Sequence, residues 1–168
     1  MNGLVRKVLS VKCQVLREKG CSIRIIKEHH IAQARRTARS EAEALGFSSR
    51  DVSYIETGVS ELASNLFFHT GYGGVLFFIP VSDNDRQGLE IISEDEGPGI
   101  SDIKLAMTDG YSTRGGLGGG LPGVKRLMDE FEIFSEIGKG TRIITRKWKK
   151  SNPTSPPKQN GKFLQKRK

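Results

Sequence analysis

The sequence predicts an α+β fold, a two-layer sandwich in which helices cover one face of a mixed β-sheet. A short alternating run comes first, two segments with apolar residues at helical spacing follow it, and four short runs rich in β-branched and aromatic residues come later. A polar, glycine-rich segment, residues 97–120, divides those four runs into two pairs. The expected order of elements is therefore β-α-α-β-β-loop-α-β-β.

The first half is expected to hold one strand and two helices. The alternating pattern of CSIRIIKEHH, residues 21–30, is typical of a short strand. Apolar and alanine residues then recur at helical spacing over residues 31–45, and the glycine that follows suits a helix end. Ser48 or Ser49 can cap the second helix, which is expected to end near Phe68.

The second half is expected to hold two hairpins with a helix between them. The runs GGVLFFIPV and GLEIISED are joined by SDNDRQG, a composition typical of a hairpin connection. After the glycine-rich segment, Pro122 stands where a helix can begin, and VKRLMDEF continues it for about two turns. FEIFSEI and TRIITRKW, separated by GKG, then form the last hairpin.

Charge and length indicate one domain with two basic ends. The 168 residues carry a net charge of +8, of which residues 1–20 hold +4 and residues 151–168 hold +5, leaving −1 for residues 21–150. We therefore expect a basic N-terminal extension over residues 1–20, one domain over 21–150, and a tail over 151–168 whose composition is typical of disorder. Basic tails are commonly solubilising appendages, so no nucleic-acid partner is expected.

Cysteine content and hydropathy favour a cytoplasmic protein. Cys13 and Cys21 form no C-x-x-C pair, which argues against a disulfide framework or a zinc site. The longest apolar run, Val75–Ile79, is far shorter than the ~20 residues that a membrane-spanning helix needs. No membrane partner is expected.

Glu61 and Asn65 lie four residues apart near the end of the second expected helix. Side chains at positions i and i+4 share one helix face, so the carboxylate and the carboxamide project together. Such a pair can serve a hard cation such as Mg²⁺, which takes few protein oxygens, and a proton to be removed. The alternative for this segment alone is a solvated polar face.

The sequence DEGPGI places Asp95 directly after an apolar strand. A carboxylate at the bottom of a pocket can accept a hydrogen bond from an exocyclic amine such as that of adenine. Gly97 and Gly99 would let a flat ligand approach the backbone closely. An ordinary turn after a strand is the alternative.

The segment GGLGGGLPGV offers consecutive backbone N–H groups ahead of a helix, an arrangement suited to phosphate. Residues 118–123 match the pattern G-x-G-x-x-G, but no apolar strand leads directly into them and no βαβ unit follows, so a dinucleotide fold is not expected. A P-loop is also absent, because no G-K-[ST] closes a glycine loop before a helix.

Together these motifs resemble the four ATP-binding boxes of the GHKL superfamily, which includes gyrase, histidine kinases and MutL. The matching residues are Glu61-x-x-x-Asn65, Asp95-x-Gly97-x-Gly99-Ile100, Gly116-x-Gly118-x-Gly120-Leu121 and Gly138-x-Gly140-Thr141. Over roughly residues 21–149 the chain is similar above all to the small bacterial serine/threonine kinases of sigma-factor regulation, including those of the stressosome.

The resemblance implies a Bergerat (histidine-kinase-like ATPase) fold with ATP and Mg²⁺ as cofactors. By matching positions, Glu61 would be the general base and Asn65 the Mg²⁺ ligand. Asp95 would hold the adenine amine in a pocket shaped by the two glycines that follow it and supported by Thr141. Residues 110–120 would form a lid over the phosphates, with cofactor contacts from Gly116, Gly118, Gly120 and Leu121.

Three cations near this lid are candidates to meet phosphate charge, namely Arg114, Lys125 and Arg126. His69 aligns with a histidine that many anti-sigma kinases carry near the nucleotide, and a helix-end cap is its alternative role. No histidine has the context of a histidine-kinase phosphorylation site, so autophosphorylation on histidine is not expected.

The function expected from the resemblance is an ATP-dependent protein serine/threonine kinase that phosphorylates STAS-domain regulators in a stressosome or partner-switching pathway of the stress response. One alternative is an anti-sigma factor kinase that also sequesters a sigma subunit. Another is a nucleotide-gated binding module that activates a phosphatase. Glu61 favours catalysis over gating, because a module that only binds needs no base.

Overall fold

The computed structural model describes residues 20–83, 86–108 and 119–150. Five strands and four helices are present in these ranges. In chain order they are β1 (Cys21–Ile25), α2 (His29–Ala44), α3 (Ser49–His69), β2 (Gly74–Asp83), β3 (Arg86–Glu94), α4 (Ile103–Ala106), α5 (Gly120–Leu127), β4 (Glu130–Glu136) and β5 (Gly140–Trp148).

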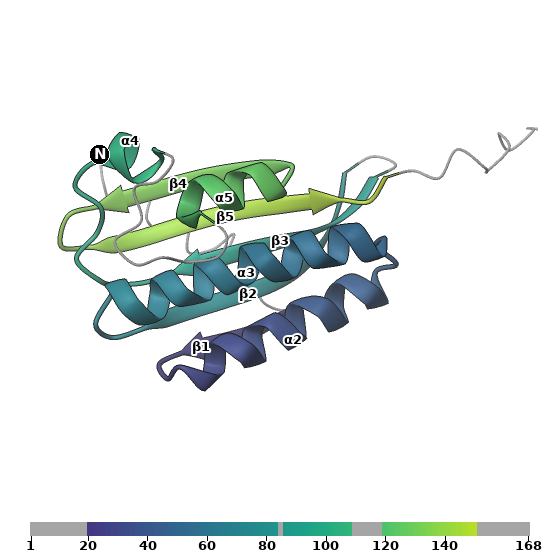
Figure 1. The fold of residues 1–168 in the computed structure, drawn as a ribbon, viewed down its shortest axis with the longest axis horizontal. Coiled ribbons are helices and arrows are strands. Elements are labelled where there is room, and N and C mark those ends of the chain that lie inside the picture. Colours follow the sequence, from purple (N-terminus) through teal and green to yellow (C-terminus); the bar gives the residue numbers. More distant parts are fainter. Residues whose placement is uncertain (1–19, 84–85, 109–118, 151–168) are drawn as a thin grey trace, which may run out of the picture.

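The strands form one sheet in the order β1-β2-β3-β5-β4. Helices α2, α3 and α5 lie on one face of this sheet (Figure 1), so the predicted α+β two-layer fold is confirmed. One detail differs from the expected mixed sheet, because each of the four pairings between the described strands is antiparallel.

Different hydrogen bonds hold the chain at the starts of the first two helices. Helix α2 begins at His29, before the expected start at residue 31, and the ring Nδ1 of His30 accepts hydrogen bonds from the backbone N–H groups of Ile26 (3.2 Å) and Lys27 (3.3 Å). Of the two candidate caps for α3, Ser48 is the one used. Its hydroxyl oxygen accepts a hydrogen bond from the Asp51 N–H at 3.2 Å, which satisfies a donor that the helix itself leaves unpaired.

The segment expected to be a long loop contains the short helix α4. Asp102 caps it, since its carboxylate accepts a hydrogen bond from the N–H of Leu105 at 2.9 Å. Helix α5 begins at Gly120, two residues before the expected Pro122, and its N-cap Gly119 has φ +79°, a conformation that favours glycine.

The main core lies between the sheet and its helices. Helix α3 contributes its buried apolar face, and α2 packs through Ala34, Ala38 and Ala42, whose small side chains allow close approach. A smaller buried cluster on the sheet consists of Phe77, Ile79 and Ile92. Because α3 is held between the sheet, α2 and α5, the side chains on its C-terminal half have fixed positions relative to β3 and β5.

Candidate nucleotide site

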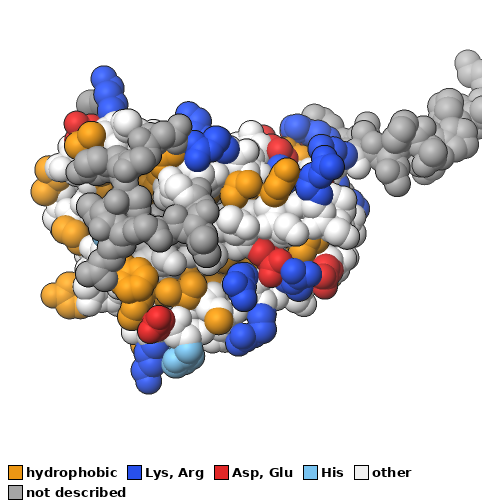
Figure 2. Space-filling model, in the orientation of Figure 1, with side chains coloured by type: hydrophobic (Ala, Val, Ile, Leu, Met, Phe, Trp, Pro, Cys, Tyr) orange, Lys and Arg blue, Asp and Glu red, His pale blue; other side chains and the backbone are white. Residues whose placement is uncertain are grey.

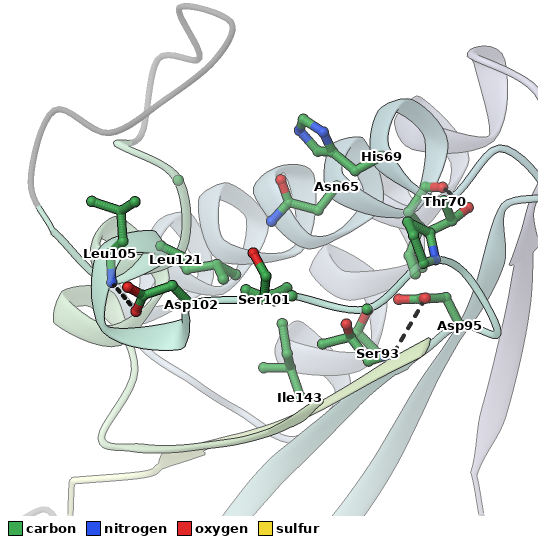
Figure 3. Close-up of a pocket in the computed structure, with 17 residues that line it drawn as sticks. Asn65, His69, Thr70, Ser93, Asp95, Ser101, Asp102, Leu105, Leu121 and Ile143 are labelled. Carbon is green, nitrogen blue, oxygen red and sulfur yellow. Dashed lines mark hydrogen bonds between the residues drawn. The ribbon is translucent and has the colours of Figure 1, made fainter. Parts of the chain in front are cut away.

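A cavity of about 400 Å³ lies at the end of the molecule where α3 ends. Its walls come from five parts of the chain: the last turns of α3, the end of β3 with the loop after it, α4, the first residues of α5, and β5 (Figure 3). The volume falls within the usual range of small-molecule sites. Figure 2 shows hydrophobic side chains on the surface at the same end of the molecule. The exposed hydrophobic residues close to the cavity in sequence are Phe68, Tyr72 and Leu105.

Asp95 lies in the wall of this cavity, directly after β3. Its Oδ1 accepts two backbone hydrogen bonds, from the N–H of Gly97 at 2.8 Å and from the N–H of Thr141 at 3.2 Å. Burial raises the pKa of this carboxyl, and the two backbone donors lower it by less. Within the described part of the chain Oδ2 has no hydrogen bond, so it is available to a ligand's donor.

Thr141 also lines the cavity, at the start of β5. Its backbone carbonyl accepts a hydrogen bond from the Asp95 N–H at 3.0 Å, which places the two residues side by side across neighbouring strands. The Thr141 hydroxyl lies 2.9 Å from the hydroxyl of Ser135, and Ser135 in turn accepts a hydrogen bond from the N–H of Ile100 at 2.8 Å. Ser135 therefore ties the loop after β3 to the β4–β5 hairpin.

Gly99 lines the cavity. Gly97 does not line it, but its N–H donates a hydrogen bond to Asp95, which does. Besides the expected room for a flat ligand, the structure gives these glycines a second reason, which is close packing within the protein. A Cβ on Gly99 would overlap the carbonyl of Glu136, and a Cβ on Gly97 would lie 2.9 Å from Thr70. Both glycines make room for other parts of the protein, and Gly99 also has φ +74°.

Helix α3 places Asn65 in the cavity, with His69 one turn later and Thr70 at the helix end. Figure 3 shows the three side chains on the wall that faces Asp95. Glu61 is half-buried one turn before Asn65 and is not part of the cavity wall. The structure thus brings Asn65 together with Asp95, and it leaves Glu61 beside the site.

The first residues of α5 close one side of the cavity. Gly120 and Leu121 line it, as expected from the sequence, while Lys125 is exposed and does not. Gly116, Gly118 and Arg114 lie outside the described residues.

Several residues of the wall were not predicted from the sequence. They are Leu66 and Thr70 on α3, Ser93 on β3, Pro98, Ser101 and Asp102 in the loop after β3, Leu105 and Ala106 on α4, and Ile143 on β5. His69 and Ile100, which the sequence analysis had singled out, also line the wall. Ser93 and Ile143 could have been found from strand periodicity, since each lies two residues from a predicted site residue on the same strand face.

Other kinds of site find little support in the described part of the chain. It contains no group of three or more histidine, cysteine, aspartate or glutamate residues that could hold a metal ion. The pKa of the Cys21 thiol is raised to about 11, mainly by burial and further by Glu41, so the thiol stays neutral and a poor nucleophile. None of the described helices has the length and hydropathy to cross a membrane.

Comparison with known families shows what kind of domain this is. The family described as the histidine kinase-like ATPase domain matches residues 25–147. The chain belongs to this family. The resemblance predicted from the four boxes is thereby confirmed, and so is the fold class of this ATPase domain.

Two curated relatives of this ATPase domain narrow the family further. The chain is 48% identical over 133 residues to the serine/threonine-protein kinase RsbT of Bacillus subtilis, a match that covers 79% of this chain and 98% of the relative. It is 33% identical over 129 residues to an anti-sigma F factor of Clostridium acetobutylicum, covering 73% and 88% of the two chains. The predicted enzyme class, a protein serine/threonine kinase, is confirmed by the first relationship.

A solved structure supports the fold alone. The crystal structure of the RsbU and RsbW domains of a Mycobacterium tuberculosis protein matches with a TM-score of 0.52 at 16% identity, over 76% of this chain. The chain spans about a third of that larger protein, 32% of its length.

Proposed function

We propose that this ATPase domain binds Mg-ATP in the cavity and transfers the γ-phosphate to a serine or threonine of a STAS-domain protein. The observation that carries the proposal is the convergence of separate sequence motifs on one cavity. Asn65 from α3, Asp95 and Gly99 from the segment after β3, Gly120 and Leu121 from α5, and Thr141 from β5 all line it. Residues up to 76 positions apart in sequence thus line one cavity. Its volume is in the range of cavities that bind small molecules.

The chemistry of the wall fits an adenine base. Asp95 Oδ2 is an acceptor free to take the exocyclic amine, and the buried Ile143 together with Leu121 offers apolar contact for the flat ring. A ligand donor would replace the water that the buried carboxylate has lost, and burial is the larger cause of its raised pKa.

Mg²⁺ belongs to the proposal as a partner of the phosphates. The carboxamide oxygen of Asn65 is the kind of ligand that Mg²⁺ takes, and this ion usually completes its shell with waters and phosphate oxygens. Bound there, Mg²⁺ would neutralise phosphate charge. Glu61, one turn earlier on α3, is proposed as the base that accepts the proton of the incoming hydroxyl.

The phosphates are proposed to lie toward the start of α5. Consecutive N–H groups at a helix N-terminus favour anions, and α5 begins at Gly120 on the cavity wall. The lid role of residues 110–120, with Arg114, Gly116 and Gly118, remains part of the proposal. Lys125 is exposed on α5, one turn from the cavity, so its contact with phosphate would require a ligand that extends beyond the wall.

The proposed partners follow from the relatives. One is named a serine/threonine-protein kinase and the other an anti-sigma F factor, and both names suit a partner-switching pathway in which kinases act on STAS-domain regulators. A phosphatase or a sigma factor is a further candidate partner, and a cytoplasmic location is part of the same proposal.

The test is phosphoryl transfer from γ-labelled ATP with Mg²⁺ to a candidate STAS-domain protein. Wild type should label the substrate, and Glu61→Ala should bind ATP normally but lose roughly 10²- to 10⁴-fold in transfer rate, the usual contribution of a general base. Glu56→Ala on the same helix is the matched control, because Glu56 forms an ion pair with Arg39 on α2 and is not part of the cavity wall. No transfer by wild type to any STAS-domain protein would contradict the proposal.

The relationship to the anti-sigma F factor favours a second candidate function, sequestration of a sigma subunit. It predicts a complex with a sigma factor that survives gel filtration and changes with the bound nucleotide. If Glu61→Ala kept full biological output while losing transfer, a nucleotide-gated binding module would account for the protein better than a kinase.

A further inference from the structure

The floor of the cavity is built from two neighbouring strands. Ser93 and Asp95 follow each other on one face of β3 and its extension, and Thr141 and Ile143 do so on β5. Ser93 is paired in register with Ile143, while the Asp95 N–H bonds to the Thr141 carbonyl at 3.0 Å. The four side chains therefore form a rectangle under the cavity, with Ser93 and Asp95 about 6.5 to 7 Å apart along the strand.

Ser93 differs from the other polar residues on this floor because its hydroxyl has no hydrogen-bond partner in the part of the chain that the structure describes. Ser93 is 4% exposed, yet its side chain forms no hydrogen bond within the described ranges. Polar groups in protein interiors are normally satisfied by a protein partner or by water. Among the described side chains, only Arg142 Nε lacks both a hydrogen-bond partner and contact with solvent. The Ser93 hydroxyl, which also lacks a partner in these ranges, must therefore be accessible to solvent, and it reaches solvent through the cavity that Ser93 lines.

Figure 3 shows the Ser93 and Asp95 side chains next to each other beneath the α3 residues. The carboxylate offers an acceptor, and the hydroxyl offers one donor with acceptor capacity to spare. Adenine carries the complementary pair on neighbouring atoms, an amine that donates and the ring nitrogen N1 that accepts. Guanine carries the reverse pair, a carbonyl that accepts and an N1–H that donates, and its carbonyl would face the Asp95 carboxylate.

We propose that Ser93 is a base-reading residue, whose hydroxyl donates a hydrogen bond, directly or through one water, to ring nitrogen N1 of the adenine whose amine is bound by Asp95. This inference rests on the proposed function, because it needs a nucleotide in the cavity. It adds a second polar contact to the base, and it explains why a serine occupies a buried position on the apolar side of β3, where Leu89 and Ile91 are its neighbours.

The test compares binding of ATP with binding of 1-deaza-ATP, in which a C–H group replaces N1, using calorimetry with Mg²⁺ and no protein substrate. Wild type should bind ATP about 3- to 10-fold more tightly, the range expected for one neutral hydrogen bond. Ser93→Ala should bind the two nucleotides equally, with an affinity close to that of wild type for 1-deaza-ATP. Ser82→Ala, an exposed serine of β2, should behave as wild type.

The outcomes separate this role from the proposed function. Equal preference for ATP in wild type and Ser93→Ala, or no preference in wild type, would overturn the role of Ser93 while leaving the nucleotide site in place. A Ser93→Ala protein that melts like wild type but binds neither nucleotide would also contradict it, because one lost hydrogen bond cannot have that effect. Failure of wild type to bind ATP at all would overturn the nucleotide site and this role with it.

Discussion

Asp95 shows how a single residue can be held in a conformation that suits a ligand better than the empty protein. Its Oδ1 is fixed by the N–H groups of Gly97 and Thr141, and its side chain lies in the cavity wall. Burial raises the pKa of the carboxyl in the folded chain above its ordinary value. The stabilisation linked to this group is therefore present below the unfolded pKa and is lost as pH rises through the folded pKa.

Asp95→Asn should consequently separate binding from stability. The asparagine Oδ1 can keep both backbone hydrogen bonds, but its amide nitrogen would then point a donor at the donor of the adenine amine. ATP affinity should fall by roughly 10- to 100-fold, the effect of losing a hydrogen bond to a charged group. The melting temperature at pH 7 should stay equal or rise, because no buried charge remains.

Calorimetric titration with ATP and thermal melting between pH 4 and 8 measure the two effects. Glu96→Gln is the control, since Glu96 is exposed next to Asp95 and should leave ATP affinity unchanged. A variant Asp95→Asn that binds ATP like wild type would contradict the role of this carboxylate.

At the scale of elements, the loop after β3 is fixed by the hairpin of β4 and β5. The N–H of Gly138 donates to the carbonyl of Pro98 at 2.9 Å, and Ser135 accepts from Ile100. Gly99 sits between these two contacts at φ +74°, with no room for a Cβ beside Glu136. The wall of the cavity therefore depends on the close approach of two elements that are about 40 residues apart in sequence.

Gly99→Ala should lower the free energy of unfolding more than Gly138→Ala does. Gly138 has nearly the same conformation, φ +73°, but nothing lies within 4 Å of its Cβ position. Gly138→Ala should cost about 1 kcal/mol for the backbone alone, and Gly99→Ala about 1–3 kcal/mol more for the overlap. Urea unfolding measures both, and equal losses in the two variants would show that the loop and the hairpin are not in close contact.

The elements themselves were largely predictable because their signals are local. Helical spacing over residues 31–45 and a cap at Ser48 or Ser49 predicted α2 and α3 to within a few residues. Helix α4 was not predicted, because its four residues are too few to show a period and lie in a glycine-rich segment. The reason for Gly99 could not be read from the sequence either, since it depends on Glu136 in another hairpin.

At the scale of the whole molecule, the antiparallel sheet and α3 bring the motifs together. The register of β3 with β5 places Asp95 beside Thr141, and the packing of α3 against the sheet sets Asn65 above them. Motif spacing predicted Asn65, Asp95 and Thr141 as site residues, because the motifs contain the residue types that binding a nucleotide requires. Ser93 and Ser135 were missed because their roles appear only when strand register is known.

The central claim is that ATP binds in this cavity, and amide NMR with titrated Mg²⁺ and a non-hydrolysable ATP analogue tests it most directly. Signals of Gly97, Gly99, Ile100 and Thr141 should shift with one shared saturation curve, while those of Arg86 and Gln87, at the opposite end of β3, should stay in place. Saturable shifts that leave the cavity residues unchanged, or no shifts at millimolar analogue, would contradict the account.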